Sequence, residues 1–509
     1  MTLFSPPPLA APPGDQPLAR RRRVGVHADH DSYKWWALSC TSLGMLLATI
    51  NSGTLIIALP ALERSLHASL LELVWVILSY MIASTVLVLS AGRFSDLFGR
   101  KRAYIAGFVV VAAASLGAGF AGSGTELIIW RVVQGIGGAL LFANAPAIVT
   151  DAFPGHQLGV AMGTNTMIAA VGLVLGPVLG GALVAIAWPW VFWFNVPLSI
   201  AGAVWAALVL HERGRRDTQR GLDLLGALTF LVGLTGFVFA ISRGGLSGWN
   251  DLLVIAGFAA AVVLLPLFVV IEAHQRAPML DLTMFRNRLF SAACGAAFLN
   301  GLSRFALMFV FVFYFQGPEG DSAIVAGLKL IPMAVGMLIA SPLAGAAADR
   351  HGSRGLATAG MVVTAAGLAL MTTLGVASPY WQTGLWLFVV GVGSGMFNSP
   401  NTAAMMGSVP PQHRGVAAGA RTLITNSGAV ISIAFVLAIV TAAVPTHVLF
   451  AIFSGLASGL SAHQLAPFIT NMHLALWILA GISLLGAGVC ALRPAQNSTG
   501  DSILAARGA

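Results

Sequence analysis

The sequence predicts an all-α polytopic membrane protein, and three observations lead to that fold class. Of its 509 residues, 57% are hydrophobic and only 9% are charged, whereas about 25% of the residues of a soluble domain carry charge. The apolar residues form long runs, each of the length that a membrane span needs. The basic residues gather in short clusters between these runs, which is the pattern of membrane loops.

Fourteen apolar runs qualify as candidate spans, and each is predicted to be a helix. Backbone groups inside lipid must be hydrogen-bonded within the chain, which a helix achieves by itself. A transmembrane β-barrel would show short segments of alternating polarity instead, and the sequence contains none. The predicted spans are 35–60, 71–92, 102–122, 126–150, 158–185, 190–210, 223–242, 251–272, 289–316, 324–346, 356–375, 383–407, 416–443 and 467–492.

The ends of the chain and its connections predict its orientation. Residues 1–34 are rich in proline and polar groups and are expected to form a disordered tail. The apolar run that follows is too long for a signal peptide, so it is predicted to be a retained span. By the positive-inside rule both termini, including the tail 493–509, are predicted to be cytoplasmic. The basic connections on that side are 100–102, 211–220, 272–288, 349–354 and 410–414.

Two stretches in the first half of the chain recur, in the same order, in the second half. GRFSDLFGR at 92–100 has a counterpart in GAAADRHGSR at 345–354, with the same spacing of Gly, Asp and Gly. NAP followed by GVAMG, between 144 and 163, is matched by NSP followed by GVAAG, between 398 and 419. Internal repeats of this kind are typical of transporters whose binding site lies between the two repeats.

The repeat divides the chain into two similar six-helix halves. The first half is predicted to occupy 35–210 and the second 289–492. The segment 211–288 then holds two extra transmembrane helices with their cytoplasmic linkers. The predicted architecture is therefore two pseudo-symmetric six-helix bundles plus two central helices, with 14 transmembrane helices in all.

Four motifs, in order along the chain, resemble those of the major facilitator superfamily. GRFSDLFGRKR at 92–102 resembles its loop signature, and RVVQGIGGALL at 131–141 its fourth-helix motif. GLVLGPVLGGAL at 172–183 is similar to its antiporter motif, and AWPWVFWFNVPL at 187–198 to a signature of the fourteen-span drug:proton antiporter branch. This resemblance, which covers 35–492, implies the major facilitator fold and export of amphipathic drugs or antibiotics by proton-coupled alternating access.

The resemblance also implies a monomer in the inner membrane of a bacterium. Its partners would be a small amphipathic substrate, protons and membrane lipid. Nucleic acid is not a predicted partner despite the net charge of +9, because the basic side chains form no face or stripe.

The cysteines lie singly in apolar runs, so no metal site is indicated, and no cofactor or enzymatic group is predicted. An exporter of a lipid or endogenous metabolite is the alternative; a receptor or structural protein is disfavoured, because a static bundle needs no duplicated latch.

The loop signature predicts a cytoplasmic latch. Its glycines permit tight turning, and its aspartate can meet an arginine or a helix N-terminus. In the family, this acid–base cluster joins the two halves on the cytoplasmic side while the protein is open outward. The latch residues are Gly92, Asp96, Gly99 and Arg100 in the first copy and Gly345, Asp349 and Gly352 in the second.

Three arginines lie inside predicted spans, where a charge costs about 3 kcal/mol at the helix centre. The fourth-helix motif assigns Arg131 to proton coupling, with Gln134 beside it and Glu126 as a candidate carboxylate. Relatives often have an aspartate in the first helix where this chain has Asn51. Two hypotheses stay open: coupling runs through Arg131 with Glu126 or a loop carboxylate, or the substrate is neutral or anionic and is met by arginines and amides.

Polar residues within the spans are the candidates for the substrate cavity, although an asparagine there often only bridges two helices. They are Asn51, Asn144, Asn165, Asn300, Arg304, Asn398, Asn401, Arg421 and Asn426.

A stripe of glycines in the fifth span forms the core of the antiporter motif. Glycines four residues apart share a helix face and permit close helix contact, and a proline among them can bend the helix. The resemblance associates this motif with export. Its residues are Gly172, Gly176, Pro177, Gly180 and Gly181.

Overall fold

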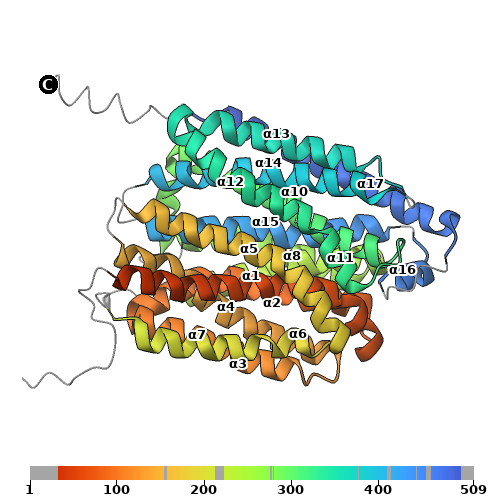
Figure 1. Cartoon of the computed structure of the whole chain (residues 1–509), viewed down its shortest axis with the longest axis horizontal. Coiled ribbons are helices and arrows are strands. Elements are labelled where there is room, and N and C mark those ends of the chain that lie inside the picture. The colour runs from red at the N-terminus through yellow and green to blue at the C-terminus, as the bar shows by residue number, and fades with distance from the viewer. Residues whose placement is uncertain are drawn as a thin grey trace, which may run out of the picture.

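The described part of the chain consists of helices joined by short connections, which confirms the all-α prediction. The computed structural model describes residues 32–153, 157–212, 223–275, 278, 280–375, 378–409, 414–442, 444–453 and 460–494. Within these residues the long helices run side by side along one direction of the molecule (Figure 1). The tails 1–31 and 495–509 and the linker 213–222 lie outside the described residues.

The helices follow the predicted order. The first half holds α1 (Tyr33–Leu66), α2 (Leu70–Phe98), α3 (Arg100–Ala118), α4 (Gly124–Ala152), α5 (Leu158–Ile186), α6 (Trp190–Trp193) and α7 (Asn195–Val209). The central segment holds α8 (Leu224–Ser247), α9 (Leu252–His274) and the 3-10 helix η2 (Leu282–Arg286). The second half holds α10 (Arg288–Gln316), α11 (Ala323–Lys329), α12 (Ile331–His351), α13 (Ser353–Met371), α14 (Tyr380–Gly407), α15 (Arg414–Thr441), α16 (Thr446–Phe453) and α17 (Ala462–Ala491).

Among the described residues, 12 helices are long and apolar enough to cross a membrane. The two further spans expected from the sequence correspond to α5 and α14. These helices have 29 and 28 residues, and about 20 residues suffice to span a bilayer. Helix α14 carries several polar residues, and Leu175–Ile186 of α5 is an apolar stretch. Length alone therefore permits all fourteen to cross.

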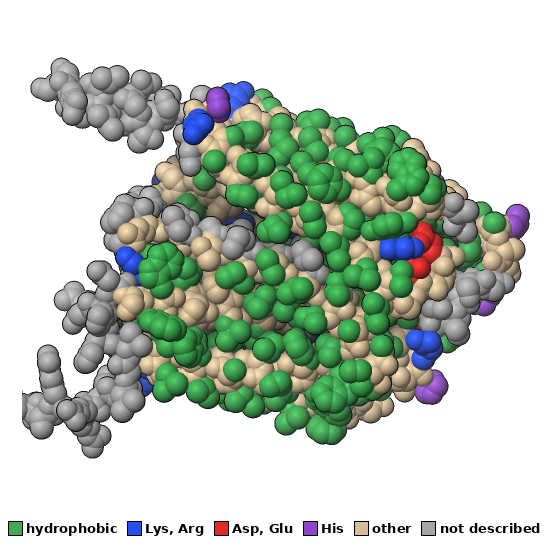
Figure 2. Space-filling model, in the orientation of Figure 1, with side chains coloured by type: hydrophobic (Ala, Val, Ile, Leu, Met, Phe, Trp, Pro, Cys, Tyr) green, Lys and Arg blue, Asp and Glu red, His purple; other side chains and the backbone are tan. Residues whose placement is uncertain are grey.

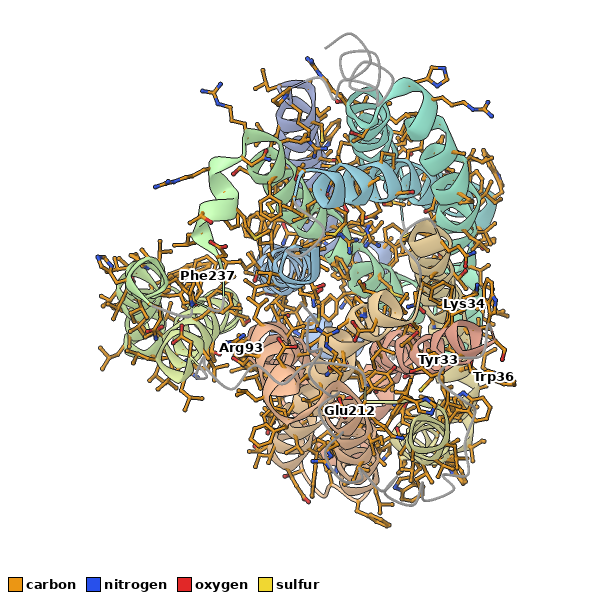
Figure 3. The ribbon with its side chains drawn as sticks, turned by 90° about the vertical axis from the view of Figure 1, so that its left-hand side faces the viewer. Tyr33, Lys34, Trp36, Arg93, Glu212 and Phe237 are labelled. Atoms are coloured by element: carbon orange, nitrogen blue, oxygen red, sulfur yellow. The ribbon has the colours of Figure 1, made fainter. Side chains whose placement is uncertain are left out.

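Helix pairing follows the same pattern in both halves. In the first half α1 packs on α5, and α4 packs on α2 and α3; in the second half α10 packs on α15, and α14 packs on α12 and α13. Between the halves, α5 lies against α11 and α12, and α15 lies against α2. The pair α8 and α9 stands to one side, near Phe237 in Figure 3, where α8 packs on α2 and α15.

The outer surface of the bundle is apolar around its middle. On the face drawn in Figure 2, hydrophobic side chains cover the middle of the molecule and most of the charged side chains lie near its two ends. Helix α9 is the clearest case, because Leu252 and Val262 are 78% and 73% exposed. A continuous apolar surface of this extent needs an apolar environment, and a lipid bilayer supplies one.

The glycine stripe of α5 brings the backbones of α1 and α5 together. A Cβ added at Gly176 would lie 2.9 Å from the Cα of Gly53, and one at Gly180 would lie 2.7 Å from the Cα of Thr54. A Cβ at Gly172 would likewise collide with the Thr49 side chain. The stripe leaves no room for side chains, so glycine is required at each of these positions.

We expect Gly176→Ala to destabilise the protein, because the new methyl group meets backbone atoms that cannot turn away. Overpacking of this kind costs about 1–3 kcal/mol, so the melting temperature in detergent should fall by several degrees. The matched control is Gly481→Ala in α17, where a Cβ meets nothing within 4 Å. Equal melting temperatures for the two variants would contradict this account of the stripe.

Candidate functional site

Arg131 of α4 is the most deeply buried charged group of the first half, with 1% of the residue exposed. Its Nε donates to the carbonyl oxygen of Val76 in α2 at 2.9 Å, and its Nη1 donates to Oδ1 of Asn51 in α1 at 3.4 Å. The guanidinium carbon also stands 4.3 Å from the centre of the Tyr80 ring. Amide and carbonyl dipoles and the face of an aromatic ring all stabilise a cation. Arg131 is therefore held by neutral groups.

Gln134 extends this network to a third helix. It lies one turn after Arg131, and residues three apart share a helix face. Its Oε1 accepts a hydrogen bond from Arg131 Nη1, and its Nε2 donates to Ser115 Oγ of α3 at 2.7 Å. Asn51, Arg131, Gln134 and Ser115 thus form one buried chain of hydrogen bonds from α1 through α4 to α3, which we call the α4 network.

Glu126 does not join the α4 network. It lies in the first turn of α4 with its side chain exposed, and its Oε2 accepts from the backbone N–H of Gly122 at 3.0 Å. Five residues separate it from Arg131, which places the two side chains on different faces of the helix. Its geometry here is that of a residue that stabilises the helix start.

Two asparagines related by the repeat bind their own helices. Asn144 donates from Nδ2 to the carbonyl of Leu140 at 2.7 Å, and Asn398 donates to the carbonyl of Ser394 at 3.0 Å. Each acceptor lies one turn earlier in the same helix, and each asparagine precedes a proline by two residues. The two halves thus repeat a local structural detail, and in this conformation neither amide nitrogen is turned toward another helix.

Other predicted cavity residues bridge helices. Oδ1 of Asn165 in α5 accepts from Ser42 of α1 at 2.9 Å, and Asn300 of α10 donates to Met361 Sδ of α13 at 3.4 Å. Asn401 of α14 donates to the carbonyl of Ala293 at 3.2 Å. These contacts are those of amides that tie helices together.

Arg493 is a buried residue that the sequence analysis assigned to the C-terminal tail. Only 1% of it is exposed, and its Nη2 donates to Asn401 Oδ1. Its backbone N–H donates to the carbonyl of Cys490, so it continues the turn that ends α17. A lone arginine directly after an apolar run was the signal in the sequence, but its burial depends on the packing of α17 beside α13 and α10.

The remaining candidates lie in the second half, away from the α4 network. Arg304 of α10 is 9% exposed and stands 4.6 Å from the centre of the Phe305 ring. Arg421 and Asn426 of α15 are half-buried. Among the hydrogen bonds of the described residues, none connects these three to Arg131.

In this structure the first copy of the predicted latch makes its ion pairs within one half. Arg100, at the start of α3, forms ion pairs with Asp151 of α4 at 2.6 Å and with Asp96 of α2 at 3.4 Å. Gly99 and Gly352 join successive helices at φ values of 104° and 82°, a region that favours glycine. The Asp349 side chain lies outside the described residues.

The other glycines of the two latch copies lie where neighbouring helices approach. A Cβ at Gly345 of α12 would lie 2.7 Å from Ser399 Oγ of α14, and one at Gly92 of α2 would lie 3.9 Å from the Cβ of Ala143 in α4. The repeat-related helix pairs therefore meet at the same point of the motif.

A second charged cluster, which the sequence analysis did not single out, lies at the opposite end of the molecule. Lys329 of α11 forms ion pairs with Glu319 and Asp321 in the preceding loop, and all three side chains are less than one fifth exposed. Burial raises the pKa of Glu319. We call this group the α11 cluster.

Helix α11 is where the antiporter motif meets the second half. A Cβ at Gly181 of α5 would lie 2.6 Å from the Cα of Ile324, and one at Gly327 of α11 would lie 2.5 Å from the carbonyl oxygen of Pro177. The motif therefore contacts α1 through one face and α11 through another.

The fold and these sites define a polytopic membrane transporter built from two helical repeats. The sequence model of the Major Facilitator Superfamily matches residues 41–285 and 293–501. The chain belongs to the Major Facilitator Superfamily, which confirms the resemblance inferred from its motifs.

The relatives include exporters of antibiotics and drugs. The chain is 30% identical to the tetracenomycin C resistance and export protein of Streptomyces glaucescens, over 76% of this chain and 72% of that one. It is 30% identical to the multidrug transporter protein MdtP of Bacillus subtilis (strain 168), over 78% of this chain and 74% of that one.

A solved structure shares the fold. The crystal structure of the human organic anion transporter MFSD10 superposes with a TM-score of 0.60, covering 90% of this chain and 99% of that one. At 16% sequence identity, this likeness concerns the fold alone.

We expect Gln134→Met to destabilise the protein, because the buried Arg131 would lose an acceptor and Ser115 a donor. Leaving such a group unsatisfied costs about 1–3 kcal/mol, so the melting temperature in detergent should fall. Val132→Met is the control, since Val132 of the same helix is 40% exposed. The α4 network would have no structural importance if both variants melted like the parent.

Proposed function

We propose that this transporter exports small amphipathic drugs or antibiotics by alternating access, driven by proton entry. The observation that carries the proposal is the burial of Arg131 in the α4 network. A charge among membrane-spanning helices is costly, so it is retained where transport or proton movement uses it. The antibiotic and drug exporters among the relatives support the same class of substrate.

The proposal includes the predicted topology. All fourteen long helices would cross the membrane, with α5 and α14 among them, and the halves 35–210 and 289–492 would flank the extra segment 211–288. Helix α1 begins and α17 ends at the same end of the molecule, on the left in Figure 1. This end would face the cytoplasm of a bacterial cell, and the protein would work as a monomer in the inner membrane.

The contact between α5 and α11 would be the outer gate of the transport cycle. Gly181 and Gly327 allow the backbones of the two halves to touch there, and Gln316 adds a hydrogen bond to the carbonyl of Ile57 at 3.3 Å. At the other end Arg100 pairs within its own half. This arrangement supports a conformation closed toward the outside, with the predicted latch forming in the opposite state.

The α4 network would couple transport to protons, with Arg131 and Gln134 as its central residues. Arg131→Ala should lower the export rate at least about tenfold, equivalent to about 1.4 kcal/mol, because no other side chain can replace the guanidinium. Substrate-dependent proton movement in membrane vesicles with an imposed pH gradient measures this rate. Arg243→Ala at a helix end is the control. An export rate that is the same with and without the pH gradient would refute coupling to protons.

Lys329→Met should open the outer gate, because α11 would lose both ion pairs that fix it to the preceding loop. The rate at which an impermeant thiol reagent labels Ala326→Cys from outside reports the opening, since Ala326 of α11 is 0% exposed. We expect about a tenfold increase in the Lys329→Met background, equivalent to about 1.4 kcal/mol.

Two controls accompany this labelling experiment. The parent without an added cysteine gives the background of the three buried native cysteines. Asn250→Cys, exposed in the connection between α8 and α9, gives the rate of a fully accessible thiol. An unchanged rate at position 326 would refute the gate, whatever the transport activity.

A further inference from the structure

Cationic side chains in the described part of the chain differ in their partners. Several near helix ends form ion pairs with carboxylates, while Lys101 donates to the carbonyl of Ala207. These pairs include Arg100–Asp151, Arg243–Asp251 and Lys329–Glu319. The arginines inside the long helices α4, α10 and α15 form no ion pair with any described carboxylate. Arg131 donates to neutral acceptors, and so does Arg493 after the end of α17, whereas Arg304 and Arg421 donate no hydrogen bond to a described residue.

Arg304 and Arg421 flank the point where α10 and α15 cross. A Cβ at Gly301 would lie 2.5 Å from the carbonyl oxygen of Thr425, so the two backbones touch there. Arg304 lies three residues beyond Gly301, and Arg421 lies four residues before Thr425. Three long helical segments lie between them, α11 with α12, α13 and α14, and each reverses the direction of the chain, so α10 and α15 run in the same direction. The two arginines therefore stand on opposite sides of the crossing, about 10 Å apart along the helix axes at 1.5 Å per residue.

Polar atoms at this crossing lack partners. Nε of Arg304 is buried without a hydrogen-bond acceptor among the described residues, and Oγ1 of Thr425 is likewise buried without a partner. The neighbouring Asn300 donates only to a thioether sulfur, which is a weak acceptor. A buried donor left unsatisfied costs free energy, and a charged one costs more. The crossing therefore lacks acceptor atoms with negative charge.

An acidic ligand supplies what the crossing lacks. Carboxylate, sulfonate and phosphate groups offer two or more oxygens that match the planar donors of arginine. The side chain next to Arg304 is Phe305, whose ring already lies against the guanidinium, so an aromatic or apolar body beside the acid group would find a suitable surface. A cationic amine would instead meet like charges from both arginines.

We propose that the crossing of α10 and α15 is an anion-binding subsite, and that the exported compound is an amphiphile with an acidic group. Arg304 and Thr425 hold the acid group, and Arg421 draws it in from the cytoplasmic side. For its role in export the subsite rests on the proposed function, but its binding chemistry does not. An acidic substrate agrees with the second hypothesis above, that the substrate is neutral or anionic and is met by arginines and amides.

Binding of two matched dyes to the purified full-length protein tests the subsite. Fluorescein is an anionic xanthene and rhodamine 6G a cationic one, and fluorescence anisotropy in detergent measures both against empty micelles. We expect fluorescein to bind at least tenfold more tightly than rhodamine 6G. Arg304→Gln should weaken fluorescein binding at least tenfold and leave rhodamine 6G binding unchanged.

Three further variants separate binding from folding. Arg243→Gln removes an arginine from a helix end and should leave both affinities unchanged. Arg304→Lys keeps the charge but loses the planar donors, so it should bind fluorescein with an affinity between those of the parent and Arg304→Gln. Thr425→Val keeps the shape of the side chain and should weaken fluorescein binding even if Arg304→Gln fails to fold.

The outcomes distinguish this inference from the proposed function. Equal or tighter binding of rhodamine 6G, or fluorescein binding that ignores both Arg304→Gln and Thr425→Val, overturns the subsite. If a protein with such binding results still exports drugs, the proposed function holds and only the anion-binding subsite is refuted. Selective, Arg304-dependent fluorescein binding without export in vesicles supports the subsite and refutes the exporter.

Discussion

The free-energy cost of placing polar groups in hydrocarbon is the constraint on which the rest of this structure depends. It requires every backbone group in the membrane to be bonded within its own helix, and it favours charges near the helix ends, where several of them form ion pairs. Against that background a buried charge is conspicuous. The three arginines inside α4, α10 and α15 are therefore the most informative residues of the chain.

The same constraint explains the importance of glycine in α5. Without a hydrophobic driving force between helices in lipid, association depends on close packing. The stripe of α5 achieves it by bringing backbones into contact, with α1 through Gly176 and with α11 through Gly181. A contact between backbones involves few interlocking side chains, so the halves can part and meet again there. One short motif thus supports both the rigidity of a half and movement between halves.

Local pattern predicted much of the fold and part of the site. Hydropathy located the long apolar helices, and the three-residue spacing of Arg131 and Gln134 placed both side chains on one face, where they meet. The contacts that sequence reasoning missed are those between distant segments. Nothing near Arg493 in the sequence indicates that it reaches Asn401, and nothing near Lys329 indicates that its helix closes on α5. Glu126 lies near Arg131 along the chain, but at a spacing of five residues the two side chains point to different faces of α4.

Asn51 links the charge of the interior to the energetics of transport. An aspartate at this position would form an ion pair with Arg131, whereas the amide leaves the positive charge of the guanidinium in place. With Arg304 and Arg421 also lacking described carboxylate partners, α4, α10 and α15 carry positive charges inside the helices that are complementary to anions. Moving one elementary charge through the membrane potential changes its free energy by about 2.3 kcal/mol per 100 mV. A cell interior is negative, so an anion leaves it downhill, and the potential itself contributes to the export of an acidic compound. The amide of Asn51 therefore affects two properties of this protein at once. It influences which substrate charge the interior favours, and it influences how export is coupled to protons.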